Sequence, residues 1–354
     1  MKKELLIASA LVSTLGVASV ANAVTATMSG SYKTGLLGKS VDDGTADTTT
    51  GLQEGNFTVS LSETTDGGIG IASSFMLANE SDSGTQTAGL TLTFTDGSKL
   101  DVINGGNAAK THDISVPGAA GDPGLSVTTA NRAQTGLDFF GEATQVGFEW
   151  HSAEDFMADG LKISASWSGD TGAAADASAA LESSWGLGAT YVTSAGDTSV
   201  TIGAGLADSD WKDSGTAPSS GSNGFHVGIS AVTGDLTVAA GFANGDKVSG
   251  GATTGATAEY EVNDNTVTSV GAKYVTGDIT LSIGYTSGEG KDSTTLGTAG
   301  TTEDASDTLG AGISYAVASG VTANIGYKDV DSQNDGSSDT KSGSSWYVGA
   351  SMSF

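Results

Sequence analysis

Few residues in this sequence could carry covalent or metal-based chemistry. The chain has no Cys and only three His, namely His112, His151 and His226. Without Cys there is no thiolate metal site, no disulfide and no Cys nucleophile. Neither His151 nor His226 has a second His nearby in strand register, and a Ser–His catalytic pair needs a His with its own partner. No GxxxxGK[ST] or GxGxxG pattern lies between a strand and a helix to hold phosphate. We therefore predict neither an enzyme nor a resident cofactor.

The balance of charge and glycine excludes two further classes of protein. The chain of 354 residues has 41 Asp and Glu against 14 Lys and Arg, a net charge of −27. Such a charge cannot supply the basic surface that nucleic-acid binding needs. The 53 Gly argue against a mostly helical fold, because Gly costs about 1 kcal/mol at a helical position.

The first 23 residues have the pattern of a cleaved signal peptide. Lys2 and Lys3 precede the apolar stretch Leu5–Val20, and Ala21–Ala23 reads Ala-Asn-Ala, which matches the A-x-A cleavage pattern. The stretch is shorter than the ~20 residues that a membrane helix needs. Removal of residues 1–23 would leave residues 24–354, which we predict to be a single domain.

Apolar and polar residues alternate over most of the remaining chain. In Trp185–Tyr191, for example, Trp, Leu, Ala and Tyr fall on one face and Gly, Gly and Thr on the other. Such a period of two is the pattern of a β-strand with one apolar and one polar face. It predicts these strands: Val24–Gly35, Phe57–Glu63, Ile69–Ala78, Ala88–Thr95, Lys99–Ile103, Gln145–His151, Leu161–Trp167, Trp185–Val192, Ser199–Leu206, Phe225–Val232, Leu236–Phe242, Val267–Val275, Ile279–Tyr285, Leu309–Val317, Val321–Lys328 and Trp346–Phe354.

Tight turns and long polar stretches alternate between these strands. The long stretches are Ala207–Asn223, Asn244–Asn265, Ser287–Asp307 and Asp331–Ser344. This order is typical of an up-and-down outer-membrane barrel, with short turns on one side and long loops on the other. Such a barrel needs an even number of strands, so we assign Gly136–Phe140 to a long third loop at about Asn104–Ala143. The predicted fold is all-β, a transmembrane antiparallel up-and-down β-barrel of 16 strands.

Charged residues inside the predicted strands share the polar register. They are Lys33, Lys99, Lys162, Lys273, Lys328, Glu149 and His226. A Lys that faced lipid at mid-bilayer would cost about 2–4 kcal/mol, so we expect the apolar register to face lipid. The polar register, rich in small Gly, Ser and Thr, would line an open, water-filled lumen. A soluble sandwich would separate its faces too, but its apolar face would be buried.

Four features are similar to those of the trimeric Gram-negative general-diffusion porins. They are the Ala21–Ala23 site, the opening strand Val24–Tyr32, the segment Asp155–Trp167 and the closing strand Trp346–Phe354, which ends on Phe. The resemblance covers nearly the whole mature chain, as a pattern more than as identity. It implies a homotrimer in the outer membrane, in contact with lipid and lipopolysaccharide.

The resemblance also implies that the third loop folds into the lumen and constricts it. In these porins acidic residues of that loop face basic residues of the wall. The corresponding loop residues here are Lys110, His112, Asp113, Asp122, Arg132, Asp138 and Glu142, and the wall residues are Lys33, Lys99 and Lys162. This chain has a single Arg where the family usually has a cluster on the wall, so the implied transverse field is weaker. A second role open to Arg132 is to hold the loop against a wall carboxylate.

These observations predict a passive channel for small hydrophilic solutes and ions, with a weak cation preference from its negative charge. Two alternatives stay open: a substrate-specific channel of the same fold, and a secreted β-rich surface or adhesive protein. The acidic clusters predicted in external loops are either solvated charge or Ca²⁺ ligands beside lipopolysaccharide. These clusters are Asp42 and Asp43; Asp208, Asp210 and Asp213; Glu303, Asp304 and Asp307; and Asp329, Asp331 and Asp335.

Overall fold

The strands of the chain form one closed antiparallel barrel. The computed structural model describes residues 24–42, 47–79, 89–102, 107–120, 135–141, 147–169, 181–211, 221–249, 260–293, 302–334 and 341–354. Each strand pairs with its neighbours in sequence, and β1 also pairs with β16, which closes the barrel. This confirms the predicted all-β architecture. The predicted signal peptide, residues 1–23, lies outside the described residues.

The described part of the chain contains 16 strands and one short helix. The helix, α1, spans Ala108–Thr111. The strands are β1 (Thr25–Val41), β2 (Thr48–Thr64), β3 (Gly70–Asn79), β4 (Leu90–Thr93), β5 (Lys99–Val102), β6 (Gly147–His151), β7 (Leu161–Gly169), β8 (Leu181–Ala195), β9 (Thr198–Trp211), β10 (Gly221–Thr233), β11 (Leu236–Ser249), β12 (Tyr260–Thr276), β13 (Ile279–Ser293), β14 (Thr302–Ala318), β15 (Val321–Asn334) and β16 (Lys341–Ser353).

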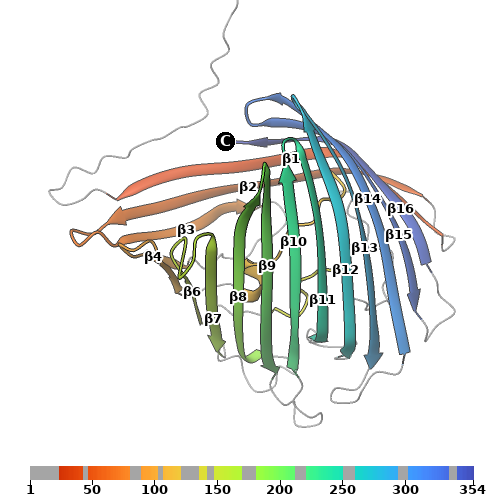
Figure 1. Ribbon diagram of the computed structural model, residues 1–354. Coiled ribbons are helices and arrows are strands. Elements are labelled where there is room, and N and C mark those ends of the chain that lie inside the picture. Colours follow the sequence, from red (N-terminus) through yellow and green to blue (C-terminus); the bar gives the residue numbers. More distant parts are fainter. Residues whose placement is uncertain are drawn as a thin grey trace, which may run out of the picture.

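Tight hairpin turns gather at one end of the barrel, at the top of Figure 1. Four of them carry a Gly with positive φ, at Gly196, Gly234, Gly277 and Gly320. Two-residue hairpin turns need such a conformation, which Gly adopts without a steric penalty. These Gly residues therefore allow the short connections that the sequence predicts.

Every predicted strand is present, but most extend beyond the predicted ends. The strand predicted over Leu309–Val317, for example, spans Thr302–Ala318, so the polar stretch before it is paired rather than loop. The acidic residues predicted in external loops are corrected accordingly: Asp208, Asp210, Glu303, Asp304, Asp307, Asp329 and Asp331 all lie in strands. Asp42 is in a turn, and Asp43, Asp213 and Asp335 fall outside the described residues.

The two registers of the wall differ as predicted. Nearly all of the large apolar side chains that are exposed belong to one register, such as Leu187, Ile229 and Ile283. We call this register the apolar face. The other register, the polar face, carries the five predicted lysines together with Glu149 and His226, and it is rich in buried Ser and Gly. Trp167, Trp185, Tyr191, Tyr285, Tyr315 and Tyr327 are exposed on the apolar face, as expected for girdle residues.

Within the described ranges, no helix has the length and apolar character required to cross a bilayer.

Candidate functional site

The third loop begins with a short helix that lies against the wall. Asn107 caps α1, because its side-chain oxygen accepts a hydrogen bond from the Ala109 amide at 3.0 Å. The helix contacts β7, β8 and β9. The Ala108 amide donates to Ser166 Oγ at 2.8 Å, and the Thr111 hydroxyl donates to the Glu149 carboxylate. All these wall residues belong to the polar face, so this face binds the start of the loop.

His112 links the loop to two strands. Its Nδ1 lies 2.7 Å from Thr190 Oγ1 on β8, and its Nε2 lies 2.8 Å from Ser164 Oγ on β7. Burial, with a smaller contribution from the neighbouring charges of His151, His226 and Lys162, lowers the pKa of His112 to about 4. The ring is therefore neutral at neutral pH and can donate through one nitrogen and accept through the other.

The same Ser164 hydroxyl joins His112 to a second histidine. His151 Nδ1 lies 2.9 Å from Ser164 Oγ, and His151 Nε2 lies 3.0 Å from Asp101 Oδ2 on β5. Asp101 also accepts from the Thr91 hydroxyl on β4. A continuous hydrogen-bonded chain thus runs from β4 to β8 through the loop. The sequence shows no second His near His151 in strand register, and it does not reveal this connection through Ser164.

His226, on β10, binds the third loop to the wall. The residue is 1% exposed, and its Nε2 donates to the carbonyl oxygen of Ala109 at 2.7 Å. Its Nδ1 lies 3.9 Å from Asp113 Oδ1. Burial raises the pKa of Asp113, His226 opposes this rise, and Asp138 adds to it. His226 is therefore a buried contact between wall and loop rather than a residue open to solvent.

A row of glycines on the polar face leaves space for the backbone of the third loop. A Cβ added to Gly188 would lie 2.3 Å from the Ala108 oxygen, and one at Gly203 would lie 2.3 Å from the His112 oxygen. Further along, a Cβ at Gly284 would lie 2.0 Å from the Pro117 oxygen. We name this set the glycine track: Gly186, Gly188, Gly203, Gly205, Gly228, Gly271, Gly284, Gly310 and Gly312. Because any larger residue would collide with the loop, the track lets residues 107–120 lie flat from β8 to β14.

A second part of the loop packs through apolar contacts. Leu137, Phe139 and Phe140 form a buried cluster with wall residues that include Ala207 and Val267. Phe139 and Phe140 meet edge to face with their centroids 5.3 Å apart. The assignment of Gly136–Phe140 to the loop is therefore correct, and its aromatic residues anchor it.

Ion pairs connect several of the predicted constriction residues. Lys110 Nζ lies 3.5 Å from Asp138 Oδ2, so the two described parts of the loop are joined. On the wall, Lys33 Nζ lies 3.6 Å from Glu54 Oε2, and Lys162 Nζ lies 2.7 Å from Glu154 Oε1. The side chains of Lys110, Asp138 and Lys162 are each at least 40% exposed.

The structure places most of the predicted site residues on the polar face or on the loop against it. Lys110, His112, Asp113 and Asp138 are on the loop; Lys33, Lys99, Lys162, Lys273, Lys328, Glu149 and His226 are on the wall. Asp122, Arg132 and Glu142 lie outside the described residues, so the roles predicted for them stay predictions. Sequence reasoning missed Asn107, Ser164, Ser166 and Thr190, which bind the loop, because polar-face Ser and Thr look alike along the chain.

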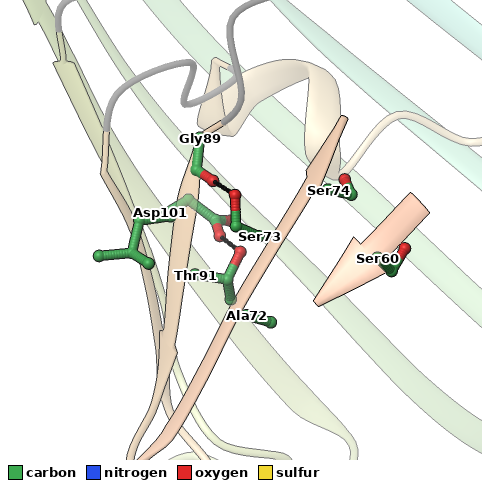
Figure 2. A pocket seen from close by; sticks show the side chains of 8 residues that line it. Ser60, Ala72, Ser73, Ser74, Gly89, Thr91 and Asp101 are labelled. Atoms are coloured by element: carbon green, nitrogen blue, oxygen red, sulfur yellow. Dashed lines mark hydrogen bonds between the residues drawn. The ribbon is translucent and has the colours of Figure 1, made fainter. Parts of the chain in front are cut away.

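A hydroxyl-lined cavity of about 310 Å³ lies on the strands β2 to β5. The Ser73 hydroxyl donates to the Gly89 oxygen at 2.8 Å, and the Thr91 hydroxyl donates to Asp101; both bonds are drawn in Figure 2. The cavity marks the place where β3 and β4 pair over only Gly70–Ala72 and Thr91–Thr93. Among the described residues, no group of three or more His, Asp or Glu side chains is arranged to hold a metal ion.

Comparisons with known proteins agree with this architecture. A sequence profile for the family described as "Gram-negative porin" matches residues 8–335. No curated protein sequence matches the chain. The structure is similar to the anion-selective porin from Comamonas acidovorans, with 11% identity and a TM-score of 0.64 over 94% of this chain and 100% of that one.

Two further solved structures are similar. One is the in-vitro folded trimer form of OmpT, an outer membrane protein of Vibrio cholerae, with 16% identity and a TM-score of 0.60 over 94% of this chain and 99% of that one. The other is a mutant of the Rh. blastica porin, with 14% identity and a TM-score of 0.53 over 93% and 100%. At these identities the likeness establishes the barrel fold.

Proposed function

The chain belongs to the family of Gram-negative porins, and on this premise we propose that it forms a passive outer-membrane channel for small hydrophilic solutes and ions. The observation that carries the proposal is that apolar and polar side chains lie on opposite faces of the closed barrel wall. Apolar side chains such as Ile229 and Ile283 are 47% and 52% exposed on one face. Lipid is the environment that satisfies such a face, and the opposite, polar face then encloses water.

Residues 107–120 and 135–141 support the proposal that the third loop constricts the lumen. Both segments contact the polar face through the glycine track and the Phe139–Phe140 cluster. A loop held there narrows the channel and brings Lys110, Asp113 and Asp138 to its narrowest part. Tyr347 is the one aromatic residue among the described side chains of the polar face. The lining therefore lacks an aromatic ladder, which favours general diffusion over a substrate-specific channel.

Conductance of the refolded protein in a planar bilayer tests this proposal. We expect discrete conductance steps that scale with the salt concentration, as a water-filled pore requires. The heat-modifiable migration typical of barrels would confirm that the refolded sample is native. A native, membrane-inserted sample without steps would contradict the channel, and recovery in the soluble fraction would favour a secreted surface protein.

A similar solved structure supports a homotrimer. The similar OmpT structure from Vibrio cholerae is a trimer form. Cross-linking in mild detergent should trap trimers, and a monomer under native conditions would contradict this assembly.

We also propose that the protein is exported through a cleaved signal peptide. The porin family and the barrel fold imply a location in the outer membrane, and cleavage after Ala23 is the expected processing step. The amino-terminal sequence of protein purified from outer membranes should begin at Val24. A start at Met1 would contradict cleavage.

We also propose that carboxylates at the outer ends of the strands bind Ca²⁺ beside lipopolysaccharide. Asp307, Asp329 and Asp331 lie on the apolar face next to Tyr285 and Tyr327, at a level where lipopolysaccharide phosphates would face carboxylates. Ca²⁺ between the two anions would relieve their repulsion. Equilibrium dialysis with Ca²⁺ should detect binding that Asp307→Asn with Asp329→Asn reduces, and equal binding by both proteins would contradict the proposal.

The total charge of the chain, taken without regard to position, supports a weak cation preference. A negative charge at the mouth concentrates cations and raises their rate of entry. Reversal potentials in a KCl gradient test the preference, and an anion-selective result would contradict it.

A further inference from the structure

The pairing of β1 with β16, which we call the seam, closes the barrel. Every other pairing of the described strands joins strands that are consecutive in the sequence, so a turn or loop restricts its register. No such connection joins β1 to β16, yet the seam is regular from Ser31 opposite Ser353 to Val41 opposite Gly343. The side chains of the two strands must therefore supply its register.

The alternation of apolar and polar residues does not specify this register. A slip by one residue would turn the apolar side chains of a strand to the polar face. A slip by two residues would keep every side chain on its own face, because Leu36 would only move from Val348 to Trp346. It would also change the stagger of the strands, and with it the tilt and diameter of the barrel. The seam therefore needs a feature that distinguishes registers two residues apart.

The glycines of β1 provide such a feature, because each lies beside an aromatic ring of the closing segment. Measured from the Cβ that each glycine would gain, the contacts are Gly38 with Trp346 at 2.2 Å, Gly35 with Tyr347 at 2.6 Å and Gly30 with Phe354 at 2.5 Å. We call these the aromatic–glycine contacts. They use every glycine of β1 and every aromatic residue of the segment 341–354. Among the described glycines, only these three have a Phe, Tyr or Trp ring of the paired segment among their nearest atoms.

Tyr347 makes the most closely fitted of these contacts. Its side chain is fully buried, and its hydroxyl donates to the Thr34 carbonyl oxygen on β1 at 3.0 Å. A Cβ on Gly349, further along β16, would lie 2.2 Å from that hydroxyl. The ring therefore occupies a space that stays open only because Gly35 and Gly349 have no side chains.

Phe354 is fixed at the other end of the seam. The Gly30 amide donates to the Phe354 oxygen at 3.0 Å, and the Phe354 amide donates to the Gly30 oxygen at 3.1 Å. Gly30 is also opposite Phe57 of β2, and the centroids of the Phe57 and Phe354 rings are 6.4 Å apart. Because a Cβ at Gly30 would collide with Phe354, this approach of the two rings needs a glycine.

We propose that the aromatic–glycine contacts select the register in which the barrel closes. In the observed register each ring meets a residue without a side chain. A slip by two residues would place Trp346 opposite Leu36 or Ser40 instead of Gly38, so its ring would meet a side chain. The inference concerns the closure of the wall and goes beyond the proposed channel function, on which it does not depend.

Disulfide cross-linking of the refolded protein measures the register directly, since the chain has no Cys. Ser31 and Ser353 are opposite each other and next to the hydrogen-bonded pair of Gly30 and Phe354. Such a neighbouring, non-hydrogen-bonded pair has Cα atoms about 4.5 Å apart, which suits a disulfide. Ser31→Cys with Ser353→Cys, the native cysteine pair, should therefore cross-link. Ser31→Cys with Ser351→Cys, the slipped cysteine pair, lies on a diagonal of about 7–8 Å and should not.

Moving the rings should move the register. The exchange variant combines Ser344→Trp, Ser345→Tyr, Trp346→Ser and Tyr347→Ser, which shifts two rings by two residues and keeps the composition. We expect the yield of the slipped cysteine pair to rise at least about tenfold, because buried aromatic rings contribute much of the contact energy. The yield of the native pair should fall.

A ring moved within a strand away from the seam provides the matched control. Ser183→Trp with Trp185→Ser also shifts a ring by two residues, but on β8, which a tight turn at Gly196 joins to β9. This variant should cross-link only through the native cysteine pair. A rise of the slipped pair in the control as well would show that the register depends on general packing rather than on the aromatic–glycine contacts.

Removal of the rings provides a second test. Trp346→Leu with Tyr347→Leu keeps apolar side chains but no ring, so both cysteine pairs should cross-link in a mixture of registers. An exchange or leucine variant that folds and cross-links only through the native pair would overturn the inference. Failure of both seam variants to form the heat-modifiable barrel, while the β8 control forms it, would support a requirement for these contacts in closure. Cross-linking does not measure current, so a negative result here leaves the channel proposal intact.

Discussion

His112 shows how much of the loop's position depends on one uncharged ring. The imidazole must accept at one nitrogen and donate at the other to join Thr190 and Ser164 at 2.7 and 2.8 Å. A second proton would remove the acceptor and place a positive charge beside His151, His226 and Lys162. A neutral His112 is therefore part of the docked state of the loop.

The lowered pKa of His112 predicts a loss of stability in mild acid. The pKa is about 4 in the folded protein against an ordinary value of 6.5 for a solvated histidine, so between these values the unfolded state binds more protons. The free energy of unfolding should then fall as the pH decreases from about 6.5 to about 4. Thermal melting in detergent across this range measures the effect, and His112→Gln should flatten the decrease.

Asp113 provides the internal control for that measurement. Its raised pKa has the opposite sign, because the folded carboxyl holds its proton more tightly than the unfolded one. It therefore contributes stability that is lost as the pH rises, and Asp113→Asn should leave the His112 decrease in place. An equally steep acid decrease in the His112→Gln protein would show that another group is responsible.

Phe140 is predicted to be the main apolar anchor of the loop. Its side chain is fully buried, edge to face with Phe139 and 6.0 Å from the ring centroid of His226. Phe140→Ala should cost about 3–5 kcal/mol of docking free energy, so the loop should become open to proteases and the channel current noisier. Phe148→Ala removes an aromatic residue that is 44% exposed on the apolar face and should leave the loop protected. Equal proteolysis of both proteins would contradict the role of Phe140.

At the scale of strands, the sequence predicts the segments that cross the bilayer but not the residues at which the strands begin and end. Between Leu309 and Val317 only one face is apolar, so the period of two is plain. Between Thr302 and Thr308 both faces are polar, yet this segment pairs with β13 through residues such as Asp304 and Asp307. Outside the lipid band nothing demands an apolar face, and the alternation that reveals a strand disappears although its hydrogen bonds continue.

The glycine track shows a second limit of sequence reasoning. Inward Gly residues are predicted to leave the lumen open, but many of them instead make room for the backbone of the third loop. The partner of Gly284 is Pro117, which lies far away in the sequence. Such a contact follows from the path of the loop around the wall, and no local pattern around either residue encodes it.

Substitution in the glycine track should alter the channel without breaking the barrel. A Cβ at Gly271 or Gly284 would lie 2.2 or 2.0 Å from the Pro117 oxygen, so the segment must move away from the wall. Gly271→Ala with Gly284→Ala should therefore lower the single-channel conductance and increase its noise. Gly51→Ala is the control, because a Cβ at Gly51 would meet nothing within 4 Å. Normal conductance in the double variant would mean that the segment does not border the open passage.

At the scale of the whole molecule, one period-two pattern specifies the environment on both sides of the wall. Ile229 and Ser230 are neighbours on β10, yet Ile229 is 47% exposed on the apolar face and Ser230 belongs to the polar face. If the apolar face contacts lipid, a charge at these adjacent positions enters two different media. A soluble barrel would separate the two positions as well, but its apolar position would be buried in a packed core, whereas Ile229 is exposed on the outside of the wall.

Exchange of each residue for Lys therefore tests the orientation of the whole barrel. Ile229→Lys should destabilise the folded protein by about 2–4 kcal/mol, the cost of a Lys in the middle of the bilayer. Ser230→Lys should cost far less, because its ammonium group stays in the water of the lumen, and it should weaken the cation preference. Reversible urea unfolding from lipid vesicles measures both stabilities, and reversal potentials measure the selectivity. Equal destabilisation by the two substitutions would mean that both faces meet the same environment, which a membrane-spanning, water-filled barrel does not allow.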